Sequence, residues 1–169
     1  LALVEGPVPN DPNLVAEAFW QDELVVVAPV DHPWGRRETI SIEQLKTEKM
    51  ITREQGSGTR RVMELALARN GLDYCDLDIR IELGSTQAIK QAVRCGMGIA
   101  IISILAVQEE CGLGRLAVLR VEDCPIVRSL SILTHAKGCL NAEERSFADL
   151  LGDRKTLQRL FPPLFSGSG

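Results

Sequence analysis

The sequence has no apolar run long enough to cross a lipid bilayer. Its mostly apolar stretches, such as Leu24–Val30 and Ile99–Leu105, are far shorter than the roughly 20 residues of a membrane-spanning helix. Lysine and arginine never occur more than two in a row, and the formal net charge is −4. We therefore expect no transmembrane helix in this chain and no basic surface for binding a phosphate backbone directly.

Cysteine and histidine motifs are absent as well. The five cysteines are scattered without a C-x-x-C pair, and there are only two histidines. This pattern predicts neither a metal site nor a thioredoxin-like motif, and an odd cysteine count argues against a disulfide framework. The expectation is reduced, mostly buried thiols in a cytoplasmic protein.

The first residues of the sequence do not resemble a secretory signal. The first ten residues, LALVEGPVPN, lack the initial Met, the basic region and the long apolar region of a secretory signal. The first four of them resemble a strand already in progress, so we expect the natural chain to continue upstream. The last four residues, SGSG, have the composition of a flexible tail or an artificial extension.

The hydrophobic pattern predicts strands alternating with helices. With 169 residues and 45% hydrophobic content, the chain can form one domain or two small lobes. Leu24–Ala28 is expected to be a buried strand, and Ser41 with Gln44 forms a capping-box pattern for a short helix. Another strand should end at Met50 and Ile51.

The next segment predicts a βαβαβ series with a parallel sheet. A helix starts near Gly58 and stops at Asn70-Gly71, where Leu67 and Leu72 are placed to meet in a Schellman cap. Residues 77–83 alternate strictly, which is typical of a strand near a sheet edge, and residues 98–102 read as a strand covered on both faces. The expected apolar stripes of the two helices between these strands are Val62, Leu65 and Ala66, and Ile89, Ala92 and Val93.

The remainder of the chain predicts four more elements. Ser103 is placed to cap a third helix that ends near Gly112, and residues 116–121 form a further strand. Another strand follows at 129–134. Asn141 with Glu144 then starts a further helix, whose apolar stripe consists of Phe147, Leu150 and Leu151.

Two glycine-serine turns are candidates for a binding site. In a parallel sheet the turns that leave the carboxyl ends of strands gather on one side, and each following helix points free N–H groups there. QGSGT contains Ser57, Gly58 and Thr59, and GSTQ contains Ser85, Thr86 and Gln87. Such turns suit small carboxylate, sulfate or phosphate ligands. The alternative is that Ser57 and Ser85 are ordinary helix caps.

Catalytic and cofactor motifs are not found. Gly56-Ser57-Gly58 lacks the G-x-S-x-G spacing of a nucleophile elbow, and QGSGTR lacks the lysine and the length of a P-loop. Gly96-Met97-Gly98 lacks the dinucleotide-binding spacing and is better explained as a tight helix-to-strand junction. We expect no enzyme activity, no metal and no cofactor.

The order of these segments resembles the effector-binding domain of LysR-type transcriptional regulators. The resemblance extends to about residue 151. The most specific parts are DELVVVAPVDHP, the GSGTR loop and the run GST-x-x-x-K-x-x-V-x-x-G-x-G-I-A.

The resemblance implies an α/β fold of the type 2 periplasmic-binding-protein-like class, with two Rossmann-like lobes joined by two crossover strands. Residues 1–29 and 127–169 would form part of lobe 1, which would be incomplete, and residues 30–126 would form lobe 2. The DNA-binding winged helix-turn-helix of this family would be absent from this chain.

The resemblance also implies what the protein does. A small anionic metabolite would bind in the cleft between the lobes and control DNA binding and transcription by the full-length protein. Gly6 and Pro7 would contact it from lobe 1, and the two glycine-serine turns from lobe 2. Family members are cytoplasmic homodimers or tetramers without a membrane partner, and the helix at 58–69 is a candidate dimer contact.

Two alternatives remain open at this point. A free-standing solute-binding protein of the same fold would require export. An enzyme on a related two-lobe fold, similar to prephenate dehydratase or hydroxymethylbilane synthase, would require a Thr-Arg-Phe motif or an arginine-rich cleft. Thr59-Arg60 is instead followed by Arg61.

Overall fold

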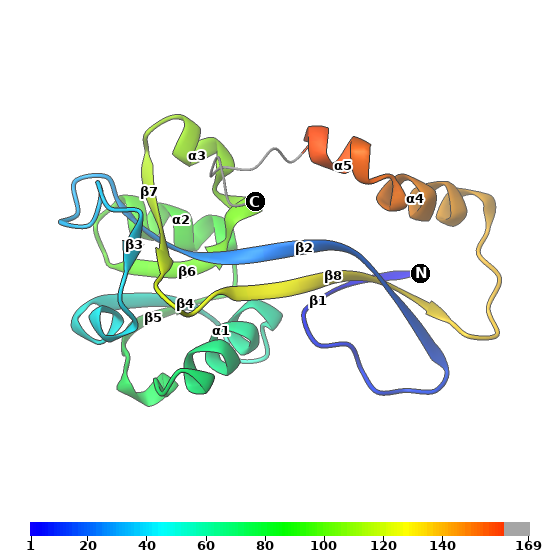
Figure 1. Cartoon of the computed structure of the whole chain (residues 1–169), viewed down its shortest axis with the longest axis horizontal. Coiled ribbons are helices and arrows are strands. Elements are labelled where there is room, and N and C mark those ends of the chain that lie inside the picture. Colours follow the sequence, from blue (N-terminus) through cyan, green and yellow to red (C-terminus); the bar gives the residue numbers. More distant parts are fainter. Residues whose placement is uncertain (161–169) are drawn as a thin grey trace. The chain divides into compact units, whose positions relative to one another are not determined.

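The structure is a computed structural model, and it describes residues 1–160. The predicted tail at 166–169 lies outside the described residues. Figure 1 shows a mixed α/β chain. In chain order the elements are β1 (Ala2–Glu5), β2 (Leu14–Pro29), β3 (Thr39–Ile40), the 3-10 helix η1 (Ile42–Thr47), β4 (Lys49–Arg53), α1 (Gly58–Arg69), η2 (Tyr74–Asp76), β5 (Asp78–Leu83), α2 (Thr86–Arg94), β6 (Ile99–Ser103), η3 (Ile104–Ala106), α3 (Gln108–Gly112), β7 (Leu116–Val121), β8 (Ile126–His135), α4 (Ala142–Gly152) and α5 (Arg154–Leu160).

The chain divides into two compact units. Of the described residues, unit 1 contains 1–22 and 128–160, and unit 2 contains Glu23–Val127. The chain therefore passes from one unit to the other twice, once within β2 and once near the start of β8. The assignment of effector-binding lobes to residue ranges stays a prediction.

Unit 2 contains the predicted parallel strands. β4 lies between β5 and β6 and runs parallel to both, whereas β6 pairs antiparallel with β2, so the sheet is mixed. Helix α1 connects β4 to its neighbour β5, and helix α2 connects β5 back past β4 to β6, so the two connections run in opposite directions along the sheet. With right-handed crossovers, this puts α1 and α2 on opposite faces, as Figure 1 shows.

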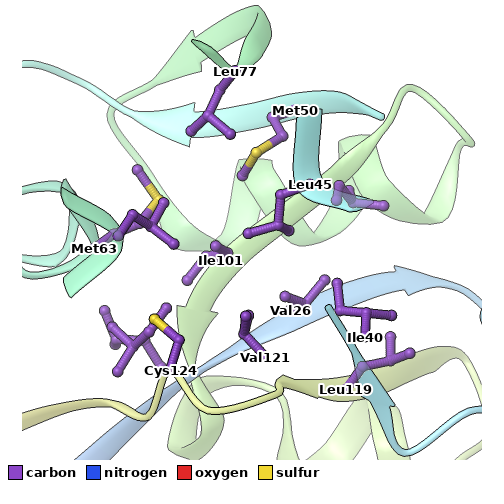
Figure 2. Packing of buried hydrophobic residues seen from close by; sticks show 14 of the residues in the cluster. Val26, Ile40, Leu45, Met50, Met63, Leu77, Ile101, Leu119, Val121 and Cys124 are labelled. Carbon is purple, nitrogen blue, oxygen red and sulfur yellow. The ribbon is translucent and has the colours of Figure 1, made fainter. Parts of the chain in front are cut away.

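The core of unit 2 lies between this sheet and α1. Alternate residues of β2 and β6, such as Val26 and Ile101, meet Met63 from α1 and Leu45 from η1 (Figure 2). The adjacent residues Val25 and Val27 are equally buried on the opposite face. Burial on both faces explains why this part of β2 is an unbroken apolar run.

Helix α1 of unit 2 ends in a Schellman cap. At the end of α1, Gly71 donates its backbone N–H to Ala68 O and Leu72 donates to Leu67 O, which is the Schellman pattern. Gly71 has a φ of 81°, and Leu67 and Leu72 are fully buried. The predicted Schellman cap is therefore confirmed by the backbone geometry.

Three predicted details of unit 2 are wrong or incomplete. Leu65 is exposed, and Met63 is buried in its place because the buried stripe of α1 is rotated toward the β2–β6 face. The predicted third helix is two short pieces, η3 and α3, separated at Val107. The thiols are not mostly buried either: Cys124 is buried and Cys111 is half-buried, whereas the exposed thiols are Cys75, Cys95 and Cys139.

Unit 1 has little buried apolar surface. β1 pairs antiparallel with β8, and the predicted capping box of α4 is present, with Asn141 and Glu144 exchanging hydrogen bonds. However, no residue of α4 is buried, and Phe147 and Leu150 of its apolar stripe are 41% and 48% exposed. The stripe predicted from the sequence thus lies open in the described part of the chain. Within residues 1–160, no helix is both long and apolar enough to cross a membrane.

Candidate effector-binding turns

The two glycine-serine turns lie next to each other in unit 2. β4 and β5 pair in parallel until their last residues, where Arg53 is the partner of Leu83. The first turn follows Arg53 and leads into α1, and the second follows Leu83 and leads into α2. Six of the eight predicted site residues are therefore brought together at neighbouring strand ends.

The first turn is fixed by its backbone. The Ser57 N–H donates to Glu54 O at 3.2 Å, and Gly56 has a φ of 93°. A residue with positive φ at the third position of a four-residue turn is typical of type II turns, and glycine adopts it at little cost. The turn delivers Ser57 to the N-cap position of α1.

The two serines behave differently as helix caps. Ser85 caps α2, because its Oγ accepts a hydrogen bond from the Ala88 N–H at 3.4 Å. Ser57 makes no capping hydrogen bond with its side chain, although the residue is only 8% exposed. The ordinary-cap interpretation therefore holds for Ser85 and does not account for the hydroxyl of Ser57.

The remaining predicted residues differ in exposure. Thr59 is buried and Thr86 is half-buried, whereas Gly58 and Gln87 are exposed. In unit 1, the predicted contacts Gly6 and Pro7 follow β1 directly, and Gly6 has a φ of 89°.

A bridging arginine is the residue that sequence reasoning missed. Arg53 donates from Nε and Nη2 to the two carboxylate oxygens of Glu54, at 2.8 and 2.9 Å, and from Nη1 to Thr86 Oγ1 at 3.4 Å. Its guanidinium thus connects the first turn to the start of α2. The hydrogen bond from Arg53 also lowers the pKa of the Glu54 carboxyl below its usual value. The Arg-Glu pair directly before QGSG was the available signal in the sequence.

Arg60 forms a second set of contacts beside the turns, and its Nη1 also donates to the backbone oxygen of Arg53 at 3.4 Å. Its guanidinium contacts Glu64 and Glu82, each at 2.7 Å, and lies 4.2 Å from the centre of the Tyr74 ring. The hydrogen bond to Glu64, followed by that to Glu82, raises the pKa of Arg60. Arg60 is thus held by these carboxylates and orders the first turn of α1, while Arg61 is exposed.

The comparisons with known proteins agree on one family. The model of the LysR substrate binding domain matches residues 1–156. The chain belongs to the LysR substrate binding domain family. The curated relatives include the RuBisCO operon transcriptional regulator of Acidithiobacillus ferrooxidans, which is 36% identical over 86% of this chain and 46% of the relative. They also include the transcriptional activator CmpR of Synechocystis, which is 36% identical over 86% of this chain and 47% of the relative.

A solved structure supports the same conclusion for the fold. The CcmR regulatory domain of Synechocystis, in complex with 2-PG, superposes with a TM-score of 0.77 at 31% identity and covers 96% of this chain and 74% of that one. The LysR family chain thus has the predicted α/β fold of LysR regulatory domains, which is the type 2 periplasmic-binding-protein-like fold. It spans about half the length of the curated relatives that it matches.

Proposed function

We propose that this chain is the effector-sensing regulatory domain of a LysR-type transcription factor and that it binds a small anionic metabolite. The observation that carries the proposal is the pair of adjacent glycine-serine turns, each at the start of a helix and joined by Arg53. The relatives are transcriptional regulators, so a free-standing solute-binding protein is not favoured.

The physical basis is the convergence of hydrogen-bond donors. Each helix N-terminus favours an anion by about 0.3–1 kcal/mol, and each hydrogen bond to a charged group adds about 1.5–3 kcal/mol. Two converging ends with two bonds each approach the roughly 8 kcal/mol of a micromolar ligand before ordering costs are subtracted. The Ser57 hydroxyl makes no capping hydrogen bond and is suited to donate one to the ligand. The other proposed contacts are Gly58 and Thr59 in the first turn and Ser85, Thr86 and Gln87 in the second.

The proposal extends to residues and partners outside unit 2. Gly6 and Pro7, which follow β1 in unit 1, are proposed as further contacts of the ligand. DNA binding belongs to an N-terminal winged helix-turn-helix of the full-length protein, which acts in the cytoplasm as a homodimer or tetramer. The role is regulatory and not catalytic. A winged helix-turn-helix encoded upstream in the complete reading frame is the expected result, and a secretory signal there would contradict it.

Ser57→Ala is expected to weaken ligand binding by about tenfold, which corresponds to about 1.4 kcal/mol, because one hydrogen bond to a charged group is lost. Thr86→Ala should have a similar effect. The measurement is isothermal titration of 2-PG and of other small anions into the protein encoded by the complete reading frame. Ser146→Ala, on the exposed face of α4, is the matched control. Affinities of the Ser57 and Thr86 variants within twofold of the control would refute the site.

A further inference from the structure

Unit 1 contains an arginine held between two carboxylates of very different exposure. Arg128 Nε contacts Asp22 Oδ2 at 2.8 Å, and Arg128 Nη1 contacts Glu5 Oε2 at 2.7 Å. The side chains of Asp22 and Arg128 are 0% and 4% exposed, whereas that of Glu5 is 58% exposed. The guanidinium therefore lies between a buried carboxylate and an exposed one.

The two ion pairs of Arg128 have different physical characters. A buried carboxylate such as Asp22 needs its arginine, because an uncompensated charge in the interior is costly. An exposed carboxylate such as Glu5 is hydrated on most of its surface, and exposed pairs contribute little to stability. The inner partner is thus fixed, and the outer partner is exchangeable.

The outer carboxylate lies at a turn that already belongs to the proposed site. Glu5 is the last residue of β1 and directly precedes Gly6 and Pro7. The Gly6 N–H donates to Ser129 O at 2.9 Å, which holds this turn against the residue after Arg128. We call Nη1 of Arg128, which contacts Glu5, the outer arm of the guanidinium. If Glu5 moved aside, an oxyanion bound at the Gly6 turn could accept a hydrogen bond from this outer arm.

We propose that the outer arm of Arg128 is an anion-binding subsite of unit 1 and that the Glu5 carboxylate occupies it in the absence of ligand. The ligand group is a carboxylate or a phosphate, since both accept from the two-pronged donor face of a guanidinium. The inference rests on the proposed function, because it assigns one anionic group of the effector to unit 1. Binding exchanges one charge-assisted pair for another, and Asp22 keeps its own bond throughout.

The experiment compares two single-charge changes in the same unit. Glu5→Gln removes the internal competitor, and Glu17→Gln removes an exposed carboxylate of β2 as the matched control. The probes are 2-PG and inorganic phosphate, titrated calorimetrically into the protein encoded by the complete reading frame. Glu5→Gln is expected to bind 2-PG about fivefold more tightly than Glu17→Gln, because the ligand no longer displaces a carboxylate.

A second comparison assigns the effect to Arg128. Arg128→Lys keeps the positive charge beside Asp22 but loses the fork that reaches both partners, so adding Glu5→Gln to it should no longer tighten binding. If Arg128→Lys does not fold, the two glutamine variants alone decide.

The outcomes separate this inference from the proposed function. Equal affinities of Glu5→Gln and Glu17→Gln, with binding still weakened by Ser57→Ala, overturn the Arg128 subsite and leave the proposed function standing. If 2-PG, phosphate and the wider panel of small anions all fail to bind every variant, both are overturned. Tighter binding of Glu5→Gln that persists in the Arg128→Lys background also overturns the subsite.

Discussion

Arg128→Met is expected to lower the free energy of unfolding by about 3–5 kcal/mol, because it leaves the Asp22 carboxylate buried without its cation. Asp22 is 1% exposed and lies 106 residues from Arg128 in the sequence, so the pair joins β2 to β8 within unit 1. Urea unfolding followed by circular dichroism measures the change, and an unaltered dependence on urea concentration verifies that the transition is the same one.

The next carboxylate along β2 provides the control. Glu23 forms a two-pronged pair with Arg120 at 2.8 and 2.9 Å, but these side chains are 23% and 38% exposed. Arg120→Met should therefore cost at most about 1 kcal/mol. The double variant Asp22→Asn with Arg128→Met should recover part of the loss, since no charge then stays buried. Equal losses in the two arginine variants would show that burial does not set the value of these pairs.

Local signals in the sequence accounted for most of unit 2. The boundaries of α1 and α2 follow from a glycine-serine turn before each helix and a glycine with positive φ after it, at Gly71 and Gly96. These are local requirements of the backbone, which is why one sequence suffices to find them. The strict alternation of residues 77–83 likewise identified β5 as an edge strand.

Long-range interactions were not predictable in the same way. β2 starts at Leu14, well before its apolar run at Leu24, and no hydrophobic pattern marks this first part because much of the surface of residues 14–21 is exposed. The contacts of Arg53 with Thr86 and of Arg128 with Asp22 join residues that no periodic pattern connects. The exposure of Leu65 and Phe147 depends on which other elements pack against each helix, and the helix propensity of the sequence does not contain that information.

Gly98→Ala is expected to destabilise unit 2 by about 3 kcal/mol or more, because two separate costs combine at this residue. Gly98 has a φ of 153°, in a region that side chains disfavour, and an added Cβ would lie 2.4 Å from the backbone oxygen of Lys49. Lys49 begins β4, and the neighbouring residues Met50 and Ile99 are paired in the sheet, so relieving the clash would separate β4 from β6.

Gly96→Ala is the matched control two residues earlier. Gly96 has a φ of 73°, but nothing lies within 4 Å of a Cβ built there, so only the backbone cost of about 1–2 kcal/mol applies. Thermal and urea unfolding of the two variants should therefore differ by about 1–2 kcal/mol or more, with Gly98→Ala the less stable. Equal losses would mean that the close approach of β4 to Gly98 contributes nothing. The expected difference would instead show that Gly98 is needed for the close packing against β4, the strand that leads into the first glycine-serine turn.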